Sequence, residues 1–180
     1  PINALLAALG NYGGTTQTHA LLPGSPAINA GTSTGAPAND QRGKARFGNV
    51  DIGAVESQGF TLALNGGTPQ TTPVTTAFAN PLSVTVAAND ANDPVNGGQV
   101  TFTPPVSGAS ATIAGNPAVI ASGVATTGTV TANGTVGGPY NVAANAIGAA
   151  AAVNFALTNI CPTITVNPTT VPTGTAGTAY

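Results

Sequence analysis

Charged residues are scarce in this sequence. Its 180 residues include three cations, five anions and one histidine, and the formal net charge at pH 7 is -2. Active sites are usually built from converging acids, bases and nucleophiles, and this chain has little material for one. Nucleic acid and anionic lipid bind clusters of lysine and arginine. Because the chain has only three cations, we expect neither as a partner. The composition favours a protein that is not an enzyme.

Cysteine is limited to Cys161, so no intramolecular disulfide can form and no zinc site can use paired thiolates. We expect Cys161 to be a half-buried residue of a linker, with an intermolecular disulfide as the alternative. Long apolar runs are also missing, and the longest one, residues 146–153, is far too short to span a membrane. The chain has no basic region near Pro1 of the kind that opens a secretion signal.

The sequence is rich in apolar residues and in neutral polar ones. Disordered proteins combine low hydrophobicity with high net charge. This chain is 42% hydrophobic and has a net charge of -2, so we do not expect it to be disordered. Threonine and valine favour strands, while the 24 glycines and 15 prolines favour turns. This mixture predicts an all-β fold of many short strands.

The charges divide the chain into parts. Residues 1–58 contain all three cations, whereas the only charged residues among 59–158 are Asp90 and Asp93. We therefore predict a boundary near residue 58 and a second near residue 159. The last part, residues 160–180, is expected to be a C-terminal strand or the start of a further repeat, and it becomes rich in proline and glycine after its strand-like stretch. In the first part turn signals dominate, and we expect Ile2 to Leu9 to form a short strand, with a helical turn as the alternative.

The second part, residues 59–159, carries regular strand signals separated by turns. The expected strands are Phe60–Asn65, Leu82–Ala88, Val100–Thr103, Ser110–Ala114, Val124–Ala132, Tyr140–Ala146 and Ala151–Leu157. In the second of these, Leu82, Val84 and Val86 are expected on one face. About seven strands in about 100 residues predict an immunoglobulin-like β-sandwich. A strand-like stretch, Thr163–Asn167, follows in the tail.

Three motifs of the first part occur in a characteristic order. They are residues 16–31 (TQTHALLPGSPAINAG), Asp40-Gln41-Arg42-Gly43 and residues 51–56 (DIGAVE). Together they resemble the C-terminal part of the right-handed parallel β-helix of bacterial surface proteins with a choice-of-anchor Q domain. The resemblance implies a β-helix terminal or capping segment over residues 1–58. The family often has Asp at the position of Asn29, and its β-helix has many coils upstream that are not in this sequence.

The second part resembles the immunoglobulin-like repeats of large bacterial adhesins. The resemblance rests on residues 81–86 (PLSVTV), 100–102 (VTF), 110–112 (SAT), 123–126 (GVAT) and 140–142 (YNV). Residues 164–180 resemble the start of a further repeat. Neither resemblance implies catalysis in these portions.

The densest polar cluster consists of Asp40, Arg42, Asp51 and Glu56. Two carboxylates can act as the acid and base of a glycoside hydrolase, and parallel β-helices include polysaccharide-cleaving enzymes. We favour a structural role, because the motif resemblance places these residues where open strand edges need covering. Aspartate can bond turn amides, and arginine can bridge carbonyls and carboxylates.

Other residues carry weaker signals. Asp90 and Asp93 alternate with other oxygen-bearing residues and are weak calcium candidates, although the loop lacks the glycine and distal glutamate of an EF-hand. His19 has no neighbouring acid or cysteine and is expected to be a packing residue. Asn133-Gly134-Thr135 is a glycosylation sequon that we interpret as a turn. No cofactor and no catalytic residue is predicted.

The sequence therefore predicts a structural component of a secreted or cell-surface bacterial protein: a spacer, stalk or filament subunit. Its expected partners are neighbouring copies or adjacent domains, and residues 160–180 are expected to pair head-to-tail with an open edge of a neighbour. One alternative is an adhesin module that binds a surface glycan or protein. The other is a non-catalytic fragment of a β-helical carbohydrate-active enzyme.

Overall fold

A computed structural model describes residues 2–46 and 49–164. Within these ranges every regular element is a strand, which confirms the predicted all-β fold, and no helix is present that could cross a membrane. The strands are β1 (Phe60–Gly66), β2 (Gln70–Pro73), β3 (Ser83–Ala88), β4 (Gln99–Thr103), β5 (Ala111–Ile113), β6 (Ala118–Ala121), β7 (Val124–Thr126), β8 (Val130–Ala132), β9 (Gly137–Asn145) and β10 (Val153–Ile160).

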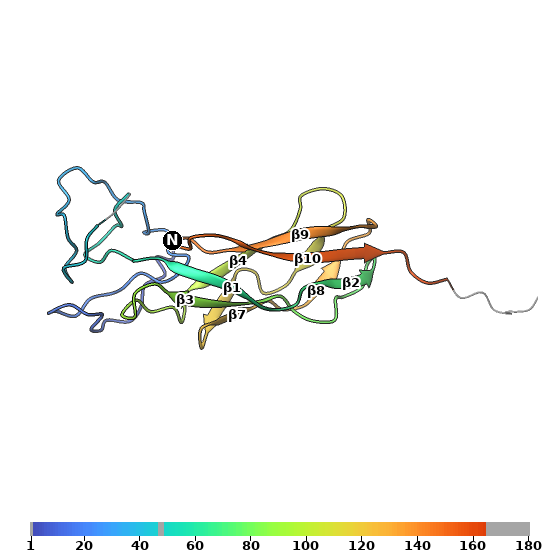
Figure 1. Cartoon of the computed structure of the whole chain (residues 1–180), viewed down its shortest axis with the longest axis horizontal. Coiled ribbons are helices and arrows are strands. Elements are labelled where there is room, and N and C mark those ends of the chain that lie inside the picture. The colour runs from blue at the N-terminus through green and yellow to red at the C-terminus, as the bar shows by residue number, and fades with distance from the viewer. Residues whose placement is uncertain (1, 47–48, 165–180) are drawn as a thin grey trace, which may run out of the picture.

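Eight strands form one curled sheet in the order β1-β3-β7-β6-β4-β9-β10-β2, and β5 and β8 form a second, two-stranded sheet. Neighbours pair antiparallel except β10 and β2, which are parallel. The curl brings β1 close to the start of β10, the second strand from the other end of the sheet, since Phe60 in β1 bridges to Ala149 in the loop before β10. We call residues 60–160 the β-domain; it is elongated along the strands (Figure 1).

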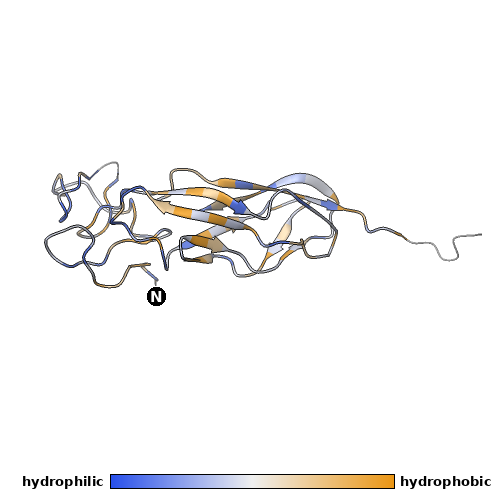
Figure 2. Ribbon diagram, turned by 60° about the horizontal axis from the view of Figure 1, so that its bottom comes forward, coloured by the Kyte–Doolittle hydropathy of each residue, from blue (hydrophilic) through white to orange (hydrophobic). Residues whose placement is uncertain are grey.

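The core of the β-domain follows from the alternation of side chains along its strands. Leu82, Val84 and Val86 are 0, 0 and 4% exposed, which confirms that they share a buried face. Phe102 in β4 and Phe155 in β10 are also buried, with ring centroids 5.8 Å apart. Figure 2 shows hydrophobic residues concentrated along the strands of this domain.

Some predicted strands differ in the structure. The expected strand Val124–Ala132 is two strands, because residues 127–129 turn the chain out of the large sheet and β8 then pairs with β5. Sequence reasoning missed β2, which is bounded by prolines, and the short β6. Thr163 and Ile164 are not in a strand, and residues 165–167 of that expected stretch lie outside the described residues.

The N-terminal segment, residues 2–58, is built of turns and isolated bridges. Its described residues form no strand, so the expected strand over Ile2–Leu9 is wrong. Leu5 has a φ of +47°, outside the β region, and only Leu6 of this stretch makes a bridge, to Leu21. The bridges within the segment are antiparallel.

The N-terminal segment packs against one end of the β-domain, while residues 161–164 leave from the opposite end (Figure 1). Leu21 and Ile28 from the segment belong to the core cluster of the β-domain. Backbone contact is close: the Gln99 N–H donates to Pro23 O at 2.9 Å, and a Cβ added to Gly24 would lie 2.8 Å from Gln99 O. The two parts therefore share an interface that leaves no room for larger side chains.

Candidate functional site

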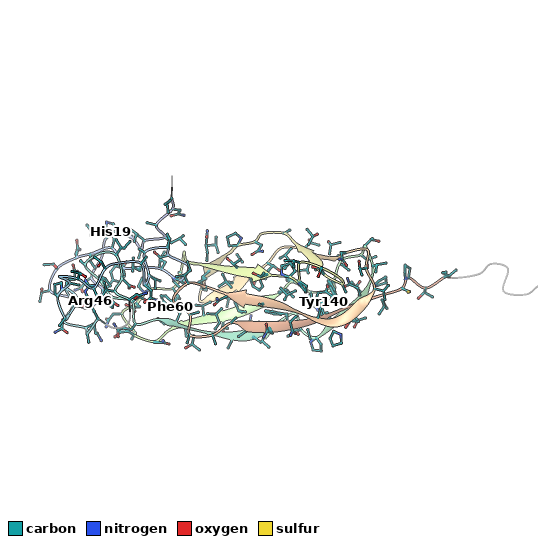
Figure 3. All side chains as sticks on the ribbon, turned by 90° about the horizontal axis from the view of Figure 1, so that it is seen from above. His19, Arg46, Phe60 and Tyr140 are labelled. Carbon is teal, nitrogen blue, oxygen red and sulfur yellow. The ribbon has the colours of Figure 1, made fainter. Side chains whose placement is uncertain are left out.

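The charged residues gather where the N-terminal segment meets the β-domain, and we call this cluster the charged junction. It contains all three cations, each paired with at least one acid. Figure 3 shows Arg46 and Phe60 toward the same end of the molecule, with Tyr140 toward the other. The cluster consists of Asp40, Arg42, Lys44, Arg46, Asp51, Glu56, Asp90 and Asp93. Residues on both sides of the predicted boundary thus form one site.

Arg42 lies at the centre of the charged junction, and its side chain is fully buried. Its Nε donates to Asp40 Oδ2 at 2.9 Å, and Nη1 donates to Asp93 Oδ1 at 2.6 Å. The third arm, Nη2, donates to the Glu56 carbonyl oxygen at 2.5 Å. A planar guanidinium with several donors suits such a fork. Burial disfavours its charge, but the hydrogen bonds to Asp93 and Asp40 outweigh this and raise the pKa of Arg42.

Asp40 holds the loop that presents Arg42. Its Oδ1 accepts from the Arg42 N–H at 2.8 Å and from the Lys44 N–H at 3.0 Å, so the carboxylate organises the turn that follows it. Its Oδ2 also accepts from the Glu56 N–H at 2.9 Å. Burial acts to raise the pKa of Asp40, but these N–H donors and the Arg42 side chain lower it overall.

Asp90 and Asp93 are the contribution of the β-domain to the junction. They lie in the loop after β3, and Asp93 Oδ2 also accepts from the Gln58 N–H at 2.8 Å. Asp90 pairs with Lys44, and this hydrogen bond, together with those from Asn92, lowers the pKa of Asp90 to about 2. Because Asp93 bonds both Arg42 and the backbone before β1, it joins the two parts of the chain.

Asp51 and Glu56 are buried carboxylates, 4 and 1% exposed. Asp51 accepts from the N–H groups of Asn29 and Ser57, at 2.7 and 2.6 Å. Glu56 Oε2 accepts from Arg46 Nη1 at 2.8 Å and from the Asp51 N–H at 3.0 Å. Burial raises the pKa of Asp51 despite its two N–H donors. These oxygens bind groups of the chain itself.

The surface pocket beside this carboxylate pair has a volume of about 270 Å³, and neither acid lines it. Its lining includes Asn29, Ser57, Gln58 and Asn89. A hydrolase needs its acid and base to face bound substrate. Here the side chains of Asp51 and Glu56 face the inside of the N-terminal segment.

The four residues given a structural interpretation, Asp40, Arg42, Asp51 and Glu56, therefore come together. The structure adds Asp90 and Asp93 to them. Their interpretation as weak calcium ligands does not fit this arrangement, because each carboxylate binds a cationic side chain. In the described ranges, no three side chains of metal-binding type gather around a common point.

The remaining singled-out residues lie apart from the junction. His19 is exposed, and its Nδ1 lies 2.8 Å from Ala7 O. Cys161 is exposed and has a free thiol, so the expected half-buried setting is wrong. Asn133 of the sequon donates from Nδ2 to Gly108 O at 2.8 Å, so its amide nitrogen is engaged within the fold.

Sequence reasoning missed two asparagines that bond to distant backbone. Asn159 is completely buried at the far end of the β-domain, where Nδ2 donates to Ser110 O and Oδ1 accepts from the Tyr140 hydroxyl. The Asn116 side chain accepts from the Phe102 N–H at 2.9 Å and donates to its carbonyl at 2.7 Å. The local sequence has no signal for these roles, since the partners are distant in the chain.

Comparison with known proteins gives no match: no family model, no curated protein and no solved structure is similar to this chain. The two resemblances noted in the sequence stay predictions.

Proposed function

We propose that this chain is a structural, non-catalytic part of a bacterial extracellular surface protein, in which it acts as a spacer or stalk. The observation that carries the proposal is the charged junction. Its cations bind acids of both parts of the chain, and its buried carboxylates bind backbone N–H groups. The few charged residues of the chain thus hold its two parts together.

The path of the chain also supports a spacer. Figure 1 shows the chain starting beside the place where the N-terminal segment meets the β-domain, while residues 161–164 leave from the opposite end of that domain. The length of the β-domain therefore separates the two ends of the described chain. The close backbone packing at Pro23, Gly24 and Gln99 favours a fixed angle between the two parts.

We further propose that the β-domain is an immunoglobulin-like sandwich capped by residues 2–58, whose antiparallel bridges differ from the parallel ladders expected of a β-helix. In support, β1 pairs antiparallel with β3 while the next strand, β2, pairs parallel with β10. The segment from β1 to β2 thus pairs first with β3, in one half of the curled sheet, and then with β10, in the other half. The predicted head-to-tail strand addition involves residues 160–180, and residues 165–180 lie outside the described residues.

The purified chain is expected to turn over no substrate in a panel of polysaccharides. The physical reason is that the buried acids Asp51 and Glu56 bond to groups of the chain itself and do not line the neighbouring pocket. Reducing-sugar release and lyase absorbance are the measurements. The matched control is Glu56→Gln: turnover by the wild-type chain that this variant loses would contradict the proposal.

A further inference from the structure

The outer edge of β1 has unpaired backbone groups. The Phe60 N–H donates to Gly148 O and the Phe60 carbonyl accepts from the Ala150 N–H, so this residue points away from β3. Backbone groups of successive strand residues point to opposite sides. The backbone N–H and carbonyl groups of Leu62 and Leu64 therefore point away from β3, like those of Phe60. No backbone partner faces these groups among residues 2–46 and 49–164.

The other edges of the β-domain are blocked or short. Strand β4 pairs with β6 only at Gln99 and Val100, which leaves the rest of that side without a strand partner. There the Asn116 amide bonds both backbone groups of Phe102. The β2 edge is preceded by Pro69 and ends at Pro73, and neither residue has an N–H to offer. The β5 edge is three residues long. Prolines, side-chain plugs and short length are devices by which proteins protect strand edges.

The β1 edge lacks these three devices over Phe60–Leu64, where its pairing with β3 is regular, and the register shifts only between Leu64 and Gly66. It contains no proline, and no charged residue occurs from Gly59 to Asn89. Its apolar side chains are only partly covered: Leu62 is 7% exposed, whereas Leu64 on the same face is 49% exposed. An uncharged edge beside an exposed leucine is a site for pairing with another strand.

We propose that β1 binds β1 of a second copy of this chain, pairing antiparallel about a twofold axis at Ala63. In this register Leu62 of each copy faces Leu64 of the other. Both residues point outward, so each copy contributes two N–H donors and two carbonyl acceptors and all are matched. Because neither edge carries charge, no repulsion opposes the approach of identical surfaces.

A second copy is the occupant we propose because it brings an edge that is equally free of charge and an equally exposed Leu64, so the two exposed leucines cover each other's surroundings while the backbone groups pair. The contact is small and uses four backbone hydrogen bonds, which is typical of weak association. The dimer is therefore expected at high protein concentration, in equilibrium with monomer. The spacer function does not depend on this contact, so failure of one proposal leaves the other intact.

Disulfide trapping tests the register in a Cys161→Ser background, which removes the exposed native thiol. The Ala63→Cys variant places the two new thiols opposite each other in a non-hydrogen-bonded pair, about 4.5 Å between Cα atoms, which suits a disulfide. The control Thr61→Cys has an exposed side chain on the same face, but its copies would lie about 13 Å apart along the strands. We expect a disulfide-linked dimer of the first variant at least tenfold in excess over the second.

Sedimentation of the full chain over a range of concentrations tests the edge itself. Leu64→Lys is expected to abolish concentration-dependent dimerisation, whereas Val119→Lys, on the exposed side of β6, leaves it unchanged. A chain that stays monomeric at all concentrations, or equal cross-linking of both cysteine variants, overturns the proposal. It is also overturned if Ile164→Lys abolishes association while Leu64→Lys does not, since the occupant is then the C-terminal tail.

Discussion

Arg42 shows how a charge can be buried in this chain at acceptable cost. A buried ion is expensive unless it is paired and fully hydrogen-bonded. The guanidinium has two carboxylates and a carbonyl as partners, and the Asp40 and Asp93 side chains are themselves 0 and 2% exposed. Removing the arginine would leave two acids buried beside each other without a cation.

Replacing Arg42 with alanine is therefore expected to lower the free energy of unfolding by about 3–5 kcal/mol, as measured by urea denaturation. Arg42→Lys keeps the charge but not the fork, and an intermediate loss is expected. Lys44→Ala is the matched control, because the Lys44 side chain is 41% exposed and such pairs contribute about 1 kcal/mol or less. Equal losses for the alanine variants at positions 42 and 44 would refute a special role of Arg42.

Strands β9 and β10 are tied at their far end by a polar group in the interior. Asn159 in β10 donates to the carbonyl of Ser110 at 3.0 Å and to that of Thr135 at 3.2 Å. It also accepts from the hydroxyl of Tyr140 in β9 at 2.9 Å. Burial raises the pKa of Tyr140, although the bond to Asn159 acts against this. One side chain thus connects β10, β9 and two loops.

Asn159→Ala is expected to destabilise the chain by about 1–3 kcal/mol, because buried polar partners would be left without hydrogen bonds. Thermal unfolding followed by circular dichroism is the measurement. Asn141→Ala in β9 is the matched control, since Asn141 is exposed and lies in the strand next to β10. A similar melting temperature for the two variants would contradict the role given to Asn159.

At the scale of the whole molecule, the N-terminal segment and the β-domain are expected to unfold together. They share a core through Leu21 and Ile28, and they share the charged junction through Asp93. Calorimetry should show a single transition at pH 7. Two separate transitions would mean that the parts are independent.

The same transition should move to lower temperature as the pH falls from about 4 to 2. The pKa values of Asp40 and Asp90 are lowered from 3.8 in the fold, that of Asp90 to about 2, so their contribution is present above 3.8 and lost on acidification. Asp51 acts in the opposite direction, since its raised pKa favours the folded state when protonated. Lys44→Ala, which removes the chief cause of the Asp90 shift, should reduce this pH dependence.

Part of this architecture follows directly from the sequence. Alternating apolar residues such as Leu82, Val84 and Val86 predict a strand with one buried face, because side chains alternate across a strand whatever the partner. Frequent glycine and proline between such stretches predict the turns. The clustering of Asp40, Arg42, Asp51 and Glu56 in a short span also predicts that they meet, because they are close in the chain.

The tertiary structure decided what depends on contacts between distant residues. Asp93 follows Arg42 by 51 positions, and nothing around it distinguishes an arginine ligand from a calcium ligand. The break of the stretch 124–132 into β7 and β8 depends on which strands are available as partners, β3 for one and β5 for the other. Local pattern determines that a segment is extended, but hydrogen-bond partners and charge pairs are set by packing, because they join parts of the chain that only folding brings together.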